Sequence, residues 1–275
     1  MKELAGRVAA ITGAGSGIGR ALALELSRRG AGLSLSDIDE VGLLETASLC
    51  EGRGVKVSSQ RLDVADRAAV HAWSVEVVAD HGKVNLVVNN AGVSIFGTVQ
   101  ELATDEIAWL MNVNFWGVVY GTKAFLPHLE NSGEGHVVNL SSVFGLISVP
   151  SQSAYNSAKF AVRGFTDALR IELDAARSCV SSTTVHPGGI RTNIARNARI
   201  DPTVAAASHA GGGPDAFDKV ARTSAETAAV RILWAVEHNR RRVLIGHDAK
   251  VIDLMSRLPA GWYQRAFAAG ARRLL

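Results

Sequence analysis

Short apolar runs alternate with longer amphipathic stretches along most of this 275-residue chain, and this alternation limits the possible folds more than any other feature. Runs such as Val8–Thr12 and Leu86–Asn89 are apolar at nearly every position. Such runs are typical of parallel strands that are buried on both faces under covering helices. The pattern therefore predicts an α/β fold, a single-domain Rossmann-like doubly wound parallel sheet of about seven strands with helices on both faces.

The expected elements divide the chain without a linker, repeat or low-complexity block. The expected strands are Val8–Thr12, Leu33–Ser36, Val55–Leu62, Leu86–Asn89, His136–Leu140, Thr183–His186 and Arg242–Ile245. The expected helices are Ile18–Arg29, Glu40–Glu51, Ala68–His81, Asp105–Leu126, Tyr155–Ala176 and Glu226–Glu237. Residues 1–250 are thus expected to form one catalytic domain, with a lid at about 193–224 and an amphipathic C-terminal extension at 251–275.

Composition excludes several classes of protein. Apolar residues make up 47% of the chain, which is enough to bury a large core. The net charge is +3 without a block of like charges, so we expect no nucleic-acid partner. The N-terminus has no signal-peptide pattern, and no apolar run reaches 18 residues. With only Cys50 and Cys179, the chain fits a reducing cytoplasm, and its histidines show no metal-ligand spacing, so we expect no metal.

A glycine-rich turn follows the first expected strand and opens the first expected helix. It reads Thr12-Gly13-Ala14-Gly15-Ser16-Gly17-Ile18-Gly19. Glycines let the backbone approach a ligand closely, and a helix N-terminus offers free N–H groups and a positive dipole end to a pyrophosphate. The spacing is not GxGxxG, because Ile18 occupies the sixth position. We expect a dinucleotide phosphate site here, although a merely tight strand-to-helix turn is the alternative.

The second expected strand ends in an acidic residue, Asp37, which stands 18 residues after Gly19. A carboxylate there can accept hydrogen bonds from the adenosine ribose and would repel a 2′-phosphate. Neither Ser16 nor Ile38 is the basic residue that a 2′-phosphate would need. The sequence therefore favours NAD over NADP. Asp39 is the better-placed helix cap, which leaves Asp37 free for the ribose.

Tyr155 and Lys159 are four residues apart on an expected helix and therefore share a face. A nearby ammonium lowers the pKa of a tyrosine from its usual value of about 10 toward the range of a useful acid or base. The alternative is an ordinary solvated pair. Ser142 strengthens the catalytic interpretation, because it follows the fifth expected strand, where ligands lie in parallel sheets. Its hydroxyl can bond a substrate oxygen.

Asparagines occur at two otherwise apolar places. Asn114 lies within the expected helix Asp105–Leu126, and Asn89-Asn90-Ala91-Gly92 ends the fourth expected strand. A satisfied buried amide and simple strand termination are the respective alternatives to a functional role.

Taken together, these motifs resemble the single-domain type of the short-chain dehydrogenase/reductase family. The matching features are TGxxxGIG at Thr12–Gly19, Asp63 after the third strand, NNAG at Asn89–Gly92, Asn114, Ser142, the YxxxK pair Tyr155 and Lys159, Pro187-Gly188 and Thr192. They run in the family's order and at its spacing over roughly residues 5–250. Several spaced motifs together are far more specific than any one of them.

The resemblance implies a role for each catalytic candidate. Tyr155 is expected to be the general acid/base, with Lys159 lowering its pKa and binding the nicotinamide ribose. Ser142, rather than its neighbour Ser141, is expected to polarise the substrate oxygen. Asn114 is expected to support a water that links Lys159 to solvent. Hydride would pass between a carbinol carbon and the nicotinamide while the tyrosine handles the proton.

The resemblance also implies a set of cofactor contacts. Asp63 and Val64 are expected at the adenine, Asn90 on the adenosine side, and Ile190 and Thr192 at the nicotinamide carboxamide. The whole expected set is Gly13, Ser16, Gly17, Ile18, Gly19, Asp37, Asp63, Val64, Asn90, Ala91, Gly92, Tyr155, Lys159, Pro187, Gly188, Ile190 and Thr192. An NADPH-preferring carbonyl reductase and a non-catalytic NAD-binding sensor or scaffold are the competing functions.

The substrate and the partners are less constrained. Apolar residues after Ser142, together with Phe217 and Ile200 in the expected lid, indicate a lipophilic secondary alcohol or ketone, with ordinary packing as the alternative. The extension carries Trp262 and several arginines, so we expect it to pack on the protein or a subunit, with peripheral contact to an anionic membrane surface and disorder as the alternatives. The family resemblance implies a homodimer or homotetramer formed through the two longest expected helices.

Overall fold

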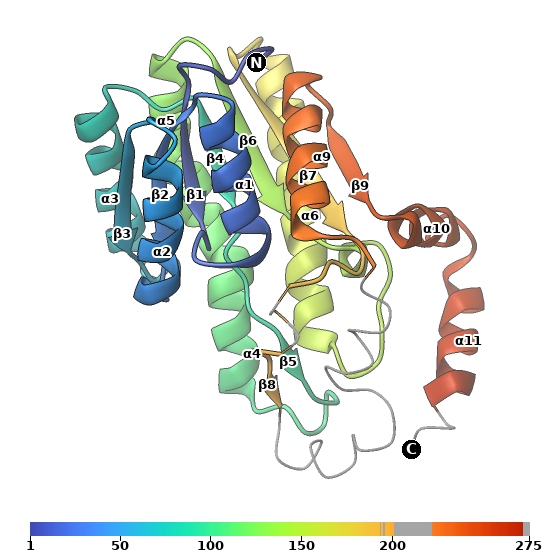
Figure 1. Cartoon of the computed structure of the whole chain (residues 1–275). Helices are drawn as coiled ribbons and strands as arrows, with labels where there is room; N and C mark the ends of the chain where they lie inside the picture. Colours follow the sequence, from blue (N-terminus) through green and yellow to red (C-terminus); the bar gives the residue numbers. More distant parts are fainter. Residues whose placement is uncertain (193, 195, 201–221, 272–275) are drawn as a thin grey trace.

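A computed structural model describes residues 1–192, 194, 196–200 and 222–271. Its centre is a seven-stranded parallel sheet (Figure 1). The strands are β1 (Val8–Thr12), β2 (Gly32–Asp37), β3 (Val57–Arg61), β4 (Leu86–Asn89), β6 (Gly135–Leu140), β7 (Val180–Pro187) and β9 (Arg242–Ile245). Their order is β3-β2-β1-β4-β6-β7-β9, so the direction of winding reverses between β1 and β4. In open parallel sheets, ligands bind at such a reversal, beyond the carboxyl ends of the strands.

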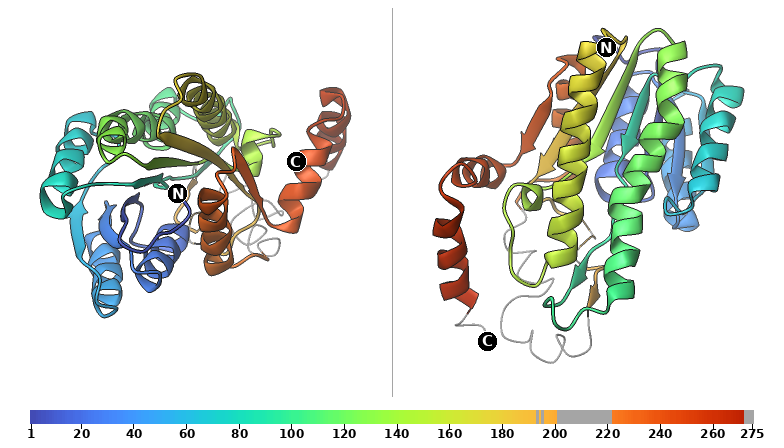
Figure 2. Two further views of the ribbon diagram at one scale, coloured as in Figure 1. Left: turned by 90° about the horizontal axis from the view of Figure 1, so that it is seen from above. Right: turned by 180° about the vertical axis from the view of Figure 1, so that it is seen from behind.

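Helices cover both faces of this sheet (Figure 2, left). Helices α1 (Gly17–Arg28), α2 (Glu40–Glu51) and α9 (Ala225–Glu237) bury one core, which contains Leu22, Leu43 and Ile232. Helices α3 (Arg67–His81), α5 (Gly117–Asn131) and α6 (Ser153–Ala175) bury the other, which contains Trp73, Phe125 and Leu169. The central strands are buried along their whole length, which confirms the expected doubly wound α/β fold.

The expected single helix Asp105–Leu126 is wrong in detail. The chain forms α4 (Thr104–Met111), then a π-helical segment, η1 (Asn112–Trp116), and then α5. Helix α5 also continues past Pro127 and ends at Asn131, because a proline so near the end of a helix leaves little of the helix to disrupt. Apolar periodicity does not reveal a π segment, since that segment depends on tertiary contacts.

Several short elements had no counterpart in the sequence prediction. Strands β5 (Ile95–Phe96) and β8 (Arg199–Ile200) form a separate two-stranded parallel sheet below the main one (Figure 1). A 3-10 turn, η2 (Val143–Gly145), follows β6. Helices α10 (His247–Met255) and α11 (Ala260–Ala271) follow β9, and the expected boundary at residue 250 falls inside α10.

The ends of the expected lid at 193–224 are tied together. The Arg191 N–H donates to the Thr223 carbonyl at 2.9 Å, and Ile190 pairs with Thr223. Most of the lid, including Phe217, lies outside the described residues. Within the part of the chain that the structure describes, no helix is long and apolar enough to cross a membrane.

Candidate active site

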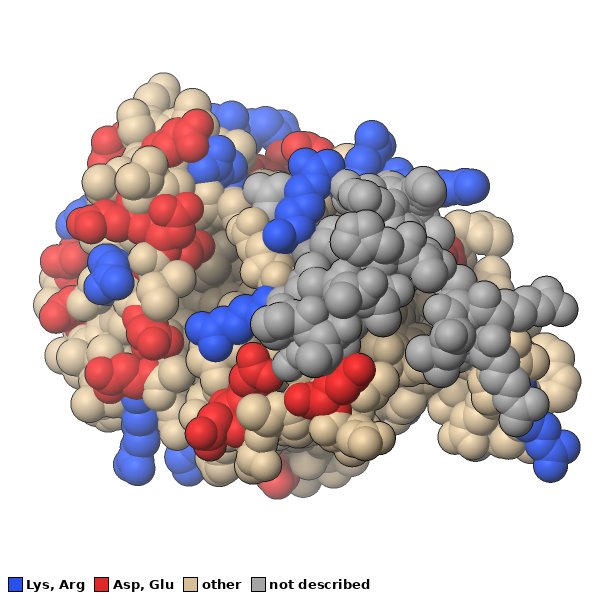
Figure 3. All heavy atoms as spheres, turned by 90° about the horizontal axis from the view of Figure 1, so that it is seen from below, with Lys and Arg blue, Asp and Glu red and all other residues tan. Residues whose placement is uncertain are grey.

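A cavity of about 1900 Å³ opens at the carboxyl ends of the parallel strands. Figure 3 views this end of the molecule and shows the hollow, bordered by side chains of both charges. The turn after β1, the ends of β2 and β4, η2, the first turns of α6 and the turn after β7 all contribute to its lining. The cavity therefore occupies the place where the winding reverses.

The glycine turn is packed so closely that side chains could not replace its glycines. Gly13 and Gly17 have φ of 66° and 51°, which favours glycine. A Cβ on Gly13 would lie 2.8 Å from the Ala91 Cα, and one on Gly19 would overlap the Gly13 carbonyl oxygen. Asn90 closes the turn, since its Nδ2 donates to the carbonyls of Thr12 and Gly13 at 3.0 Å. This cradle of exposed backbone before a helix N-terminus fits a dinucleotide pyrophosphate.

Asp37 makes two hydrogen bonds that the sequence did not predict. Its Oδ2 accepts the Gly15 N–H at 2.7 Å, and its Oδ1 accepts the Asp39 N–H at 3.0 Å. The carboxylate thus fixes the glycine turn while it also lines the cavity. The prediction for Asp39 is confirmed, because it caps α2 by accepting the Gly42 N–H at 3.3 Å.

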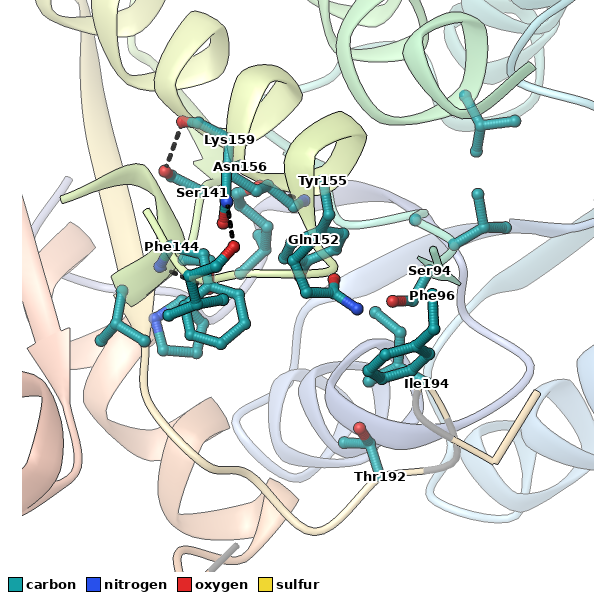
Figure 4. Close-up of a pocket in the computed structure, with 18 of the residues that line it drawn as sticks. Ser94, Phe96, Ser141, Phe144, Gln152, Tyr155, Asn156, Lys159, Thr192 and Ile194 are labelled. Atoms are coloured by element: carbon teal, nitrogen blue, oxygen red, sulfur yellow. Dashed lines mark hydrogen bonds between the residues drawn. The ribbon is translucent and has the colours of Figure 1, made fainter. Parts of the chain in front are cut away.

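Tyr155 and Lys159 project from neighbouring turns of α6 into the cavity, where Ser142 joins them. Figure 4 shows Phe144 and Ser141 on one side of Tyr155, and Ser94 and Phe96 on the other. Ser141 donates its hydroxyl to the Lys159 carbonyl at 2.8 Å, so it is a structural neighbour.

Burial has the largest effect on the tyrosine pKa in this arrangement. Burial raises the pKa of Tyr155 to about 12, and only a hydrogen bond to Ser142 acts in the opposite direction. The Lys159 Nζ lies 5.4 Å from the centre of the tyrosine ring and donates to the Leu140 carbonyl at 2.9 Å. Burial also lowers the pKa of Lys159 to about 8, which still leaves most of the amine protonated at neutral pH.

Asn114 lies behind the cavity wall and is fully buried in the π segment. Its Oδ1 accepts the Val93 N–H at 2.8 Å, and its Nδ2 donates to the Val93 carbonyl at 2.9 Å. A Cβ on Gly92 would lie 3.3 Å from the Asn114 Oδ1 and 3.7 Å from the Lys159 Nζ. The side chain therefore holds the turn after β4 beside Lys159.

Most of the other predicted cofactor residues meet at the same cavity. Besides Gly13, Asp37 and Asn90, the predicted residues in its lining are Ser16, Gly17, Ile18, Asp63, Val64, Ala91, Gly92, Pro187, Gly188, Ile190 and Thr192. Thr192 packs on the glycine turn, with its Cγ2 3.1 Å from the position of a Cβ on Gly17. Of the predicted site residues, only Gly19 and Asn114 are absent from the lining, and both lie directly behind it.

Sequence reasoning missed several lining residues. Asp248 accepts the Gly189 N–H at 2.6 Å and holds the turn after β7. Because it follows the end of β9, the strand-end argument used for Ser142 would have found it. Gln152, whose Nε2 donates to the Ile95 carbonyl at 3.2 Å, has no comparable sequence signal. Within the described ranges, no cluster of three or more His, Cys, Asp or Glu side chains could hold a metal ion.

Comparison with known proteins decides the family. The family model described as short chain dehydrogenase matches residues 7–203. This chain is a short-chain dehydrogenase. The putative oxidoreductase SadH of Mycobacterium tuberculosis is 52% identical over 274 residues, which cover 99% of this chain and 98% of that protein. A short-chain dehydrogenase/reductase from Burkholderia phymatum in complex with NAD superposes with a TM-score of 0.85, at 32% identity and 94% coverage of both chains.

A more distant short-chain dehydrogenase relative is human estradiol 17-beta-dehydrogenase 11. It is 37% identical over 197 residues, which cover 71% of this chain and 66% of that protein. The family membership predicted from the spaced motifs is therefore confirmed, and so is the oxidoreductase class.

Proposed function

We propose that this protein is an NAD-dependent oxidoreductase that interconverts a lipophilic secondary alcohol and its ketone. The observation that carries the proposal is the meeting of Ser142, Tyr155 and Lys159 with the glycine cradle in one cavity. Tyr155 offers a hydroxyl that can act as acid or base, and Ser142 and Lys159 add a second hydroxyl and an amine beside the glycine cradle. Together these groups can transfer a proton and orient a substrate.

The cofactor site fits a nicotinamide dinucleotide by its own geometry. When bound, the dinucleotide supplies the hydride acceptor or donor at its nicotinamide ring. The pyrophosphate would lie on the Gly13–Gly19 turn, and the adenosine would lie beside Asp37, Asp63 and Val64. The charge of Asp37 supports a preference for NAD, since a 2′-phosphate would lie against a carboxylate. The complex of the Burkholderia relative with NAD supports the same preference.

Proton transfer would run through Tyr155. In the oxidation direction the tyrosine takes the proton of the substrate hydroxyl while Ser142 bonds the same oxygen. Burial raises the pKa of Tyr155 to about 12, so the residue needs the ammonium of Lys159 nearby. Lys159 would exchange the Leu140 carbonyl for a cofactor ribose hydroxyl to take up this role. Asn114 would bind the relay water through its backbone, because Val93 engages both polar groups of its side chain.

The walls beyond the catalytic group support a lipophilic substrate. Phe96, Val99, Phe144 and Phe160 line the cavity, and α11 adds Phe267. The name of the human relative, an estradiol dehydrogenase, supports an apolar alcohol as the substrate class. We further propose that residues 1–250 form the catalytic domain, which includes Asp248 at the turn after β7, and that residues 251–275 form the extension.

Assembly and location follow from two exposed surfaces. Trp116 on η1 and Ile171 on α6 are exposed apolar residues, and α6 runs side by side with the continuous stretch of α4, η1 and α5 (Figure 2, right). We assign this face to a homodimer or homotetramer interface. Free Cys50 and Cys179 fit a cytoplasmic protein. Exposed Leu258 and Trp262 would support peripheral contact of the C-terminal helices with an anionic membrane.

Cofactor titration and one variant test the proposal. In titrations followed by nicotinamide fluorescence, we expect the wild-type protein to bind NADH more tightly than NADPH. We expect Tyr155→Phe to bind NADH normally while its turnover falls about 10²- to 10⁴-fold. Tighter binding of NADPH would instead identify a carbonyl reductase. Normal NADH binding without turnover of any screened alcohol or ketone by the wild-type protein would favour a sensor or scaffold. A Tyr155→Phe variant that keeps full turnover would remove the tyrosine from the mechanism.

A further inference from the structure

One guanidinium lies on the outer, substrate side of the cavity, and nothing above gives it a role. Arg199, in β8, lines the cavity together with Trp109 and Phe96. We propose that Arg199 forms an anion subsite, which binds a carboxylate at the far end of an otherwise apolar hydroxy or keto substrate. This inference rests on the proposed oxidoreductase function and names its substrate class more closely, as a lipophilic acid rather than a neutral alcohol.

The backbone and side chain of Arg199 are both held in place. Its N–H donates to the Ser94 carbonyl at 3.1 Å, and Arg199 pairs with Ile95 in the small sheet. Its guanidinium carbon lies 3.6 Å from the centre of the Trp109 ring. Stacking on an aromatic face restrains the planar guanidinium and leaves its edge N–H groups to bind an acceptor. Such a restrained fork loses little entropy when it binds a carboxylate with two hydrogen bonds.

The charge of Arg199 is not neutralised by the described part of the chain, where it forms no ion pair. The carboxylate of Glu101 lines the same cavity, but it accepts the Thr98 N–H at 2.9 Å and the Thr98 hydroxyl at 2.6 Å. Asp105 and Glu106 lie in the first turn of α4 and make no ion pair with Arg199 either. Arg199 is exposed, so its guanidinium is accessible to an anionic ligand that enters the cavity.

The position of this guanidinium points to the substrate rather than to the cofactor phosphates. The phosphate cradle lies at the start of α1, whereas β8 is bonded to β5. On its other side, the Ile95 carbonyl of β5 accepts Gln152, which stands three residues before Tyr155. Strand β5 therefore connects the catalytic helix to Arg199. Figure 4 shows Gln152 next to Tyr155, and Phe96 farther away beside Ser94 and Ile194.

Two substrates that share an apolar chain but differ in charge test the contribution of the carboxylate. We would compare 9-hydroxydecanoic acid with its methyl ester, using NAD and the wild-type protein, Arg199→Met and Arg231→Met. Arg231 is the control, because it also stacks on a tryptophan, Trp234, at 4.8 Å, but lies outside the cavity lining. In Arg199→Met we expect kcat/KM for the acid to fall about 10- to 100-fold through KM, while the ester and the control change less than about 2-fold.

A binding measurement keeps the subsite testable if neither compound is turned over. Calorimetric titration with decanoate and with 1-decanol should then show weaker decanoate binding in Arg199→Met, and partial rescue in Arg199→Lys. If the wild-type protein turned over no alcohol but bound decanoate in a manner that depends on Arg199, the oxidoreductase proposal would be overturned and the anion subsite would stand. Equal losses for acid and ester, or decanoate binding that is unchanged in Arg199→Met, would overturn the anion subsite.

Discussion

The two sides of the cavity are built in different ways. On the cofactor side, strand-end segments pack backbone against backbone, and short side chains such as Asp37 and Asn90 bond directly to the glycine turn. On the substrate side, segments meet through the ends of long side chains, as when Arg199 of β8 stacks on Trp109 of α4. The cofactor side is thus a close-packed template, whereas residues on the substrate side can change without moving a backbone.

The largest effect should come from filling the template. Gly19→Ala would place a methyl group against the Gly13 carbonyl oxygen, where no flexible side chain can yield. We expect NADH binding to be lost and the free energy of unfolding to fall by about 3 kcal/mol, the upper part of the range for overpacking. Fluorescence titration and urea denaturation measure the two quantities.

Gly261→Ala is the matched control for that variant. Gly261 is exposed in α11 and outside the cavity lining, and no described atom would lie within 4 Å of its added methyl group. Because alanine is the better helix former, we expect this variant to gain up to about 1 kcal/mol and to bind NADH normally. If Gly19→Ala bound NADH as tightly as Gly261→Ala does, the turn would not be a close-packed cofactor template.

A second experiment separates the two functions of Asp37. Asp37→Asn keeps an oxygen that can accept the Gly15 N–H but removes the charge that would repel a 2′-phosphate. Asp37→Ala removes both. We expect Asn to raise NADPH affinity relative to NADH about tenfold, and Ala to weaken both cofactors because the turn loses its support. Cofactor titrations of the two variants measure this. An unchanged NADPH to NADH ratio in both would remove the charge of Asp37 from cofactor choice.

Asp248 links the two sides, so its effect should be intermediate. Its carboxylate lies against Gly188 and accepts the Gly189 N–H, and it begins the helices that bring Phe267 to the cavity. Asp248→Ala leaves the Gly189 N–H without this acceptor. We expect NADH affinity to fall about fivefold to tenfold. Asp248→Asn retains an acceptor oxygen and should stay within about twofold of wild type, and equal losses in both variants would contradict a role through that bond.

The same contrast explains what the sequence could predict. The strand ends and the glycine turn depend on local pattern, so β1, β4 and β9 were predicted with their observed bounds. Strands β5 and β8 have only two residues each and therefore no periodicity. Arg199 and Trp109 meet only because the chain between them folds back. The hydrogen bond from Gly15 to Asp37 also escaped prediction, because strand position alone does not show how a carboxylate is used.

The smallest expected effect is on the pH dependence of the free energy of unfolding, and it should differ between the two halves of the sheet. The strands β6 and β7 bury His136 and His186, whereas β1–β4 contain no histidine. Burial lowers the pKa of His136 to about 3 and that of His186 to about 4. In the unfolded chain a histidine titrates at about 6.5, so below that pH the unfolded state binds protons that the folded state does not.

The free energy of unfolding should therefore fall as the pH drops from 7 to 5, by about 2 kcal/mol for each buried histidine. His136→Gln should remove about half of this pH dependence, whatever it does to stability at pH 7. Urea denaturation at pH 7 and pH 5 measures the difference, and His71→Gln, an exposed position on α3, is the control. If His136→Gln kept the full pH dependence, the acid sensitivity would not lie in the substrate-side strands.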